Sequence, residues 1–113
     1  MKKLLKTNKP NTFIEVELYY CKGGQSEYER ERNPRSYRLS VEPVEVEHVA
    51  GITLYSKTYT VTTGTPSNGI TLILNRPARA SKKAEAEAEA IAEKIYLGYA
   101  RQIAIKNELT LVD

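Results

Sequence analysis

Apolar and polar residues alternate along much of the first 75 positions, and a helical period replaces this alternation after position 80. Between Phe13 and Cys21 every second residue from Ile14 onward is apolar or aromatic, with Glu or Tyr between them. Successive side chains of a strand point to opposite faces, so this stretch predicts a strand with one buried and one wet face. The following Lys22-Gly23-Gly24 predicts a turn, because glycine adopts positive φ without steric cost.

A second strand is predicted from Ser36 to Glu47. Its apolar residues occupy odd positions as far as Val41 and even positions after Pro43. A proline combined with such a shift indicates a bulge or bend, and it favours a place near a sheet edge.

Two further strands are predicted downstream. The stretch from Ile52 to about Val61 is rich in Thr, Tyr and Val, which are common in strands, and Ile70 to Leu74 has a similar composition. Turn residues precede each of them, at His48 to Gly51 and at Thr62 to Gly69.

The segment from Ser81 to about Lys106 has a clear helical period. Ser81 is a good N-cap residue, and Pro77 prevents an uninterrupted earlier start. Apolar residues recur at spacings of three and four, which predicts one buried face. The predicted buried face consists of Ala84, Ala88, Ile91, Ala92, Ile95, Tyr99 and Ile103.

Strands first and a helix last predict an α+β fold, in which an antiparallel meander of about four strands has one face covered by the C-terminal helix. With 113 residues, the chain fits a single domain over positions 1–113. We expect the segment 109–112 to add a short final strand or to pack loosely.

Two segments have no clear apolar period. Residues 1–11 are rich in lysine and contain Asn and Pro, so we expect a flexible basic lead. Residues 25–35, QSEYERERNPR, are highly charged. They are predicted to form a solvated loop, with an extended arm or hairpin strand as the alternative.

Composition argues against several kinds of chemistry. One Cys and one His, Cys21 and His48, cannot form a Cys/His zinc site, and no phosphate-binding loop of the GxxxxGK[ST] type occurs. We therefore expect no metal, no cofactor and no catalytic residue, hence a protein that is not an enzyme. No apolar run is long enough for a membrane span, and the N-terminus lacks the apolar core of a secretory signal, so we expect a cytoplasmic protein.

Charge and aromatic residues favour binding as the class of function. The formal net charge is +3, but residues 1–40 carry nine Lys or Arg against five Glu. Cationic grooves with aromatic platforms hold single-stranded nucleic acid. The tyrosines of the strand region are Tyr19, Tyr28, Tyr37, Tyr55 and Tyr59. The candidate contact residues are Tyr28, Arg30, Arg32, Arg35 and Arg38.

Several short motifs resemble a pattern found in small uncharacterised proteins of bacterial mobile elements and phages. Serine stands at position 36, where glycine commonly follows the Pro-Arg pair of that pattern. The resemblance implies an accessory role in a mobile element and assigns no role to any residue. Its motifs are Tyr19-Tyr20, Lys22-Gly23-Gly24, Pro34-Arg35, Tyr37, Leu39-Ser40-Val41, Pro43-Val44, Asn75-Arg76 and Ser81-Lys82-Lys83-Ala84.

The sequence thus predicts a non-enzymatic binding or accessory protein that acts through an unidentified protein partner or through self-association. Leu97 and Ile105 lie off the predicted buried face of the helix and could form such a contact. The alternative is a single-stranded nucleic-acid-binding protein that uses the region rich in Tyr and Arg.

Overall fold

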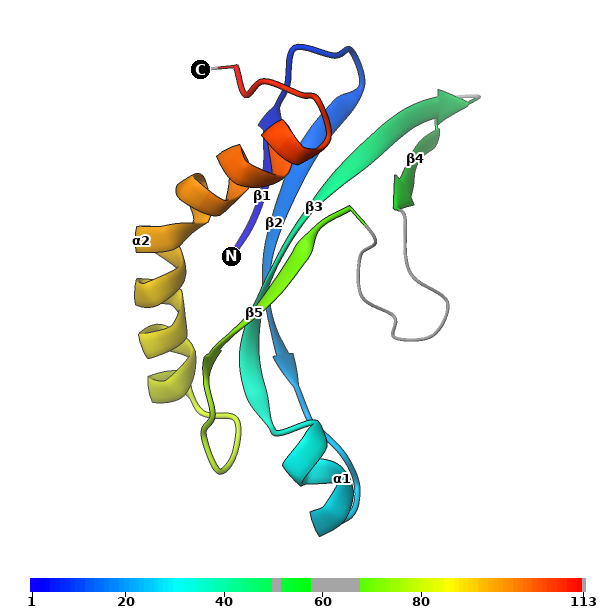
Figure 1. Ribbon diagram of the computed structural model, residues 1–113. Coiled ribbons are helices and arrows are strands. Elements are labelled where there is room, and N and C mark those ends of the chain that lie inside the picture. The colour runs from blue at the N-terminus through cyan, green and yellow to red at the C-terminus, as the bar shows by residue number, and fades with distance from the viewer. Residues whose placement is uncertain (50–51, 58–67, 113) are drawn as a thin grey trace.

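A computed structural model describes residues 1–49, 52–57 and 68–112, and it places one long helix across an antiparallel sheet (Figure 1). This confirms the predicted α+β class. Within the described residues the sheet has five strands, and a second, short helix lies at its lower end in Figure 1. The elements are β1 (Lys2–Lys6), β2 (Thr12–Cys21), α1 (Glu27–Arg32), β3 (Ser36–Val49), β4 (Ile52–Lys57), β5 (Ile70–Asn75) and α2 (Lys82–Lys106).

The long strand β3 organises the sheet. One of its edges pairs with β2, which in turn pairs with β1. Its other edge is shared, because β5 pairs with positions 37–41 and β4 pairs with positions 44–49. The last strand therefore returns to β3 rather than extending the meander beyond β4.

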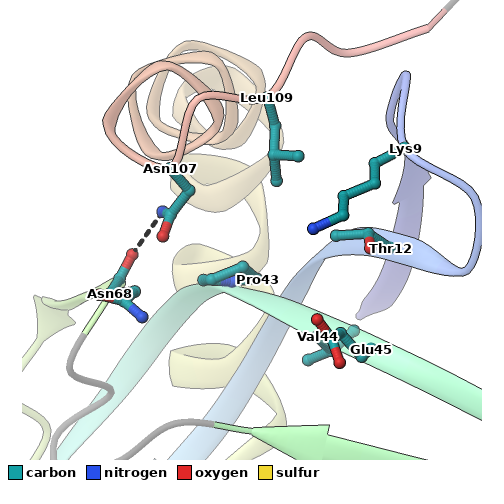
Figure 2. A pocket seen from close by; sticks show the side chains of 8 residues that line it. All are labelled: Lys9, Thr12, Pro43, Val44, Glu45, Asn68, Asn107 and Leu109. Carbon is teal, nitrogen blue, oxygen red and sulfur yellow. Dashed lines mark hydrogen bonds between the residues drawn. The ribbon is translucent and has the colours of Figure 1, made fainter.

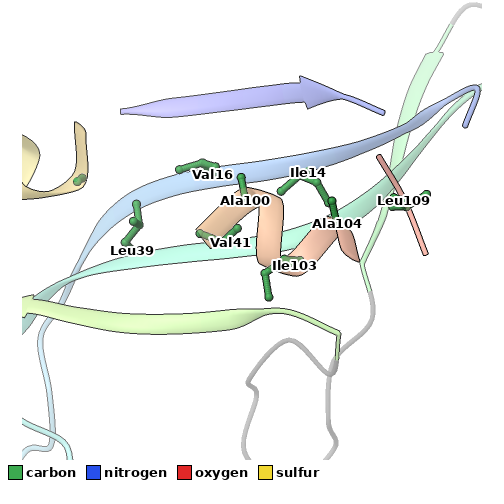
Figure 3. Packing of buried hydrophobic residues seen from close by; sticks show 9 residues of the cluster. Ile14, Val16, Leu39, Val41, Ala100, Ile103, Ala104 and Leu109 are labelled. Atoms are coloured by element: carbon green, nitrogen blue, oxygen red, sulfur yellow. The ribbon is translucent and has the colours of Figure 1, made fainter. Parts of the chain in front are cut away.

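The core lies between α2 and the face formed by β2, β3 and β5. Strand residues such as Ile14 and Leu39 meet alanines of the helix, among them Ala92 and Ala100. Figure 3 shows this packing, with Ile14, Val16, Leu39 and Val41 gathered around Ala100, Ile103 and Ala104. Because alanine is small, the helix axis can lie close to the strands.

Hydrogen bonds fix the beginning of α2 on the sheet. The Ser81 hydroxyl accepts from the Ala84 N–H at 3.1 Å, as predicted for an N-cap. The Tyr37 hydroxyl donates to the Ser81 carbonyl at 3.3 Å, and the Asn75 side-chain amide donates to the Ala84 carbonyl at 2.8 Å. The first turn of α2 is thus tied to both β3 and β5.

The predicted helix boundaries are confirmed, but part of the predicted buried face is wrong. Ile91 is 39% exposed, whereas Ala100 and Ala104 are buried. Ile95 and Tyr99 are half-buried. The sheet surface accepts small side chains along the helix line, so the buried face follows the alanines rather than the largest residues.

A bulge or bend was predicted at Pro43, and the pairing with β2 shows no bulge there. Pairing of β2 with β3 runs without a shift past the Ile14–Pro43 pair. On the other edge of β3, the pairing with β5 ends at Val41 and the pairing with β4 begins at Val44. Proline has no N–H to donate to a neighbouring strand. Pro43 lies in the gap between β5 and β4, where the missing hydrogen bond is tolerated.

The change in apolar phase has another cause. Val44 and Val46 lie on the face away from α2, and both are buried there. Glu15 lies on the same face and is only 2% exposed, so the prediction of a uniformly wet second face is also wrong. Its carboxylate lies 4.0 Å from the Lys2 ammonium.

The expectation of an irregular lead over residues 1–11 is wrong for its first half. Leu5 of β1 pairs with Ile14 of β2 and packs against the core, and side-chain exposure alternates along β1 as it does in a strand with one covered face. The C-terminal segment lies beside the end of this strand, where Thr7 and Leu111 form an isolated antiparallel bridge.

Other predicted elements are confirmed in part. β5 matches the predicted strand at 70–74, and β4 matches the first part of the strand predicted from Ile52. The remainder of that strand, most of the turn predicted at 62–69 and part of the turn at 48–51 lie outside the described residues. Over the described ranges, no helix is both long and apolar enough to cross a bilayer.

Matched alanine substitutions on α2 test this packing. Ala92 is fully buried against the sheet, whereas Ala90 is exposed on the same helix. We expect Ala92→Leu to lower the free energy of unfolding by about 1–3 kcal/mol through overpacking. Ala90→Leu should change it by less than about 0.5 kcal/mol. Urea unfolding followed by circular dichroism measures the free energy of unfolding of both variants. Equal losses of stability would contradict the orientation of α2 on the sheet.

Candidate functional site

The segment predicted as a loop or hairpin instead forms the short helix α1. Ser26 caps it, because its hydroxyl accepts from the Glu29 N–H at 3.1 Å. The Glu29 carboxylate reaches back and accepts from the Gln25 N–H at 3.0 Å. Ser followed three residues later by Glu is the capping-box pattern, and this is the sequence signal that could have found the helix.

Two glycines hold α1 against the end of β2. Gly23 has φ of +75°, and a Cβ there would lie 2.6 Å from the Asn33 carbonyl oxygen. A Cβ on Gly24 would collide with the Cβ of Glu29. The Gly24 N–H donates to the Asn33 carbonyl at 3.0 Å, which closes the loop that carries α1. Positions 23 and 24 therefore both require glycine.

The structure divides the five candidate contact residues into separate groups. Tyr28 and Arg32 are one helical turn apart on α1, and the Arg32 guanidinium carbon lies 4.7 Å from the Tyr28 ring centroid. Arg30 lies on the opposite side of α1 and lines the same two hollows as Arg35. The five side chains therefore do not form one continuous patch.

Arg38 has a structural role in this arrangement. Its Nε donates to the Ser36 hydroxyl at 2.7 Å, and one Nη donates to the Asn33 side-chain oxygen at 2.7 Å and to the Pro34 carbonyl. These bonds tie β3 to the end of α1. The guanidinium thus supports the loop that carries the other arginines.

Two adjoining hollows lie beside α1, one next to the end of β2 and the other next to the connection between β5 and α2. One has a volume of about 470 Å³ and is lined by Tyr20, Lys22, Gly23, Gly24, Gln25, Arg30 and Arg35. The other has a volume of about 340 Å³ and is lined by Arg30, Pro34, Arg35, Arg76, Pro77 and Ala78. The structure thus places Lys22 and Arg76, which were not among the candidate contact residues, beside Arg30 and Arg35.

Backbone carbonyls position the two shared arginines. Nη1 of Arg30 donates to the Gln25 carbonyl at 3.1 Å, and Nη1 of Arg35 donates to the Ala78 carbonyl at 2.9 Å. A guanidinium has five N–H donors, so each retains capacity to bind a ligand. The second bond also joins segments that are 43 residues apart in sequence.

This part of the molecule concentrates the positive charge of the chain. Segments 22–38 and 76–83 carry nine Lys or Arg against three Glu, a balance of +6, whereas the whole chain has a formal net charge of +3. The remainder is therefore net negative. We call the region formed by these two segments the basic end.

The open face of the sheet offers few aromatic groups. Tyr19, Arg38 and Ile73 lie side by side across β2, β3 and β5. Burial raises the pKa of the Tyr19 phenol, and nearby Arg38 opposes this, so the ring is neutral at physiological pH. Tyr37 is buried beneath α2, and the side chains of Tyr55 and Tyr59 lie outside the described residues. A platform of strand tyrosines is thus not formed by the described residues.

A third hollow of about 270 Å³ lies at the opposite end of the sheet (Figure 2). The Asn107 side-chain amide donates to the Asn68 carbonyl at 2.9 Å across one side of it. Lys9 and Glu45 provide one charge of each sign, so this hollow has no net preference for anions. Within the described ranges, no group of three His, Cys, Asp or Glu residues is placed to hold a metal ion.

Comparison with known proteins gave no match to this chain, whether among family models, curated proteins or solved structures.

A pair of glycine substitutions tests how the basic end is built. Gly24→Ala should lower the free energy of unfolding by more than about 1 kcal/mol, because the new methyl group collides with α1. Gly98→Ala is the control, since no described atom outside the local helix lies within 4 Å of its Cβ. It should raise the free energy of unfolding by about 0.5–1 kcal/mol, because alanine favours a helix. Thermal unfolding of both variants checks this, and a neutral Gly24→Ala would refute the tight contact.

Proposed function

We propose that this protein binds single-stranded nucleic acid through its basic end and has no enzymatic activity. The observation that carries this proposal is the convergence of Lys22, Arg30, Arg35 and Arg76 on two adjoining hollows. None of the described residues that line them is Asp or Glu. A group of cations with no carboxylate in the lining favours an anionic ligand, and arginine binds phosphate groups through paired, charged hydrogen bonds.

A single strand fits better than a duplex because of Tyr28. Its side chain is 62% exposed, and Arg32 lies over its ring. Exposed aromatic rings stack with unpaired bases, and arginine adds to this stacking. Tyr28 and the hollows lie on different sides of α1, so we expect a strand to pass around this short helix.

A protein partner is the second candidate. Leu97 and Ile105 of α2 are 40% and 75% exposed, which agrees with their position off the buried face. Apolar side chains at an exposed helix surface favour a protein contact, including self-association. An accessory role in a mobile element and a cytoplasmic location stay predictions from the sequence.

Binding to labelled single strands tests the proposal. We expect fluorescence anisotropy to detect binding of a mixed-sequence DNA or RNA oligonucleotide at low salt, with affinity that falls steeply as salt rises. The double variant Arg30→Ala/Arg35→Ala should bind about tenfold more weakly or worse, because two charged contacts are lost. Tyr28→Ala should cost about 1–3 kcal/mol of binding free energy, while Tyr28→Phe should bind as the unmodified protein does.

Arg101→Ala is the matched control for charge, because Arg101 is exposed on α2 outside the basic end. It should leave the affinity nearly unchanged. The proposal would be overturned if no binding occurs at low salt, or if Arg101→Ala and the double variant lose equal affinity for the oligonucleotide. Either result would direct the search to a protein partner.

A further inference from the structure

The two hollows of the basic end have a shared wall and separate outer walls. Arg30 and Arg35 line both of them. Lys22 lines one hollow only, and Arg76 lines the other only. Each hollow is thus surrounded by three cations, two of which it shares with its neighbour.

The surroundings of these cations suit small tetrahedral anions. Gly23 and Gly24 have no side chains to fill the first hollow, and the second has Pro34, Pro77 and Ala78, which are small and uncharged. Glu29 and Glu31 flank Arg30 in sequence, but neither lines a hollow, and the Glu29 carboxylate accepts a hydrogen bond from the Gln25 N–H. Like charges held together repel one another, so a bound anion would stabilise the arrangement.

We propose that the hollows are two neighbouring phosphate subsites, which bind two successive phosphates of one strand and share Arg30 and Arg35 as a bridge between them. This assignment rests on the proposed function. It adds that the protein contacts two successive phosphates of the nucleic-acid strand. Hydrogen bonds to Gln25 and Ala78 hold the two guanidinium groups in place before the ligand arrives. Preorganised donors lose less entropy on binding.

Calorimetric titration with inorganic phosphate and with propane-1,3-diol bisphosphate tests the two subsites without any nucleic acid. The bisphosphate separates its phosphates by the same three-carbon span as the sugar of a strand, so it should bind about tenfold more tightly than phosphate, because it gains a second set of charged hydrogen bonds. Lys22→Ala or Arg76→Ala should each weaken binding of the bisphosphate about tenfold, to the level of phosphate. Neither substitution should lower the affinity for inorganic phosphate by more than about twofold, since one subsite stays intact.

Lys22 and Arg76 are exposed, so their removal should leave folding intact, and Arg101→Ala again serves as the control for charge. With an oligonucleotide, Lys22→Ala and Arg76→Ala should each reduce the slope of log affinity against log salt by about 0.7, the value for one phosphate of a single strand.

The outcomes separate this inference from the proposed function. If the oligonucleotide binds but the bisphosphate binds no better than phosphate, the paired subsites are wrong and the proposed function stands. If the bisphosphate binds as expected and the oligonucleotide does not, the subsites stand and nucleic acid is the wrong ligand. If ADP binds as tightly as the oligonucleotide, the hollows hold the diphosphate of a free nucleotide, and the assignment to a strand backbone is overturned.

Discussion

The contact between the alanines of α2 and the face of β2 and β3 supports the rest of the structure. Ala88, Ala92 and Ala100 are fully buried there, and their small side chains let the helix lie close to the strands. A close helix also keeps its first turn within hydrogen-bonding reach of Tyr37 and Asn75. The face of the sheet toward α2 is apolar and must be covered for the domain to be stable. Packing on β2 and β3 therefore positions α2 on the sheet, and hydrogen bonds to β3 and β5 fix its first turn.

The basic end depends on this anchoring. The connection from β5 to α2 carries Arg76 and the Ala78 carbonyl, and the anchored first turn of α2 holds it beside α1. Arg35 then joins the two segments through that carbonyl. The charges that converge here come from parts of the chain more than forty residues apart, so the hollows exist only in the folded protein. Binding of an anion there, as proposed, would depend on the stability of the helix–sheet contact.

Local periodicity in the sequence was sufficient to predict α2, β2 and the α+β class, because these elements each bury one regular face. The short helix α1 was missed because its stability comes from the Ser26 cap and the backbone contacts of two glycines rather than from an apolar face. The strand β1 was missed because its lysines suggested a solvated terminus. Arg30 and Arg35 were identified by composition, but their partner Arg76 could not be, since only the pairing of β5 with β3 brings it there.

Nuclear magnetic resonance tests the central claim, that the basic end is the surface that binds phosphate groups, most directly. Amide ¹H–¹⁵N spectra of the labelled protein would be recorded during titration with an unlabelled single-stranded oligonucleotide at low salt. The account predicts that shifts concentrate in segments 22–38 and 76–83, which adjoin in the fold although they are distant in sequence. Shifts concentrated on the exposed surface of α2, or in the hollow formed by Lys9 and Asn107, would contradict it.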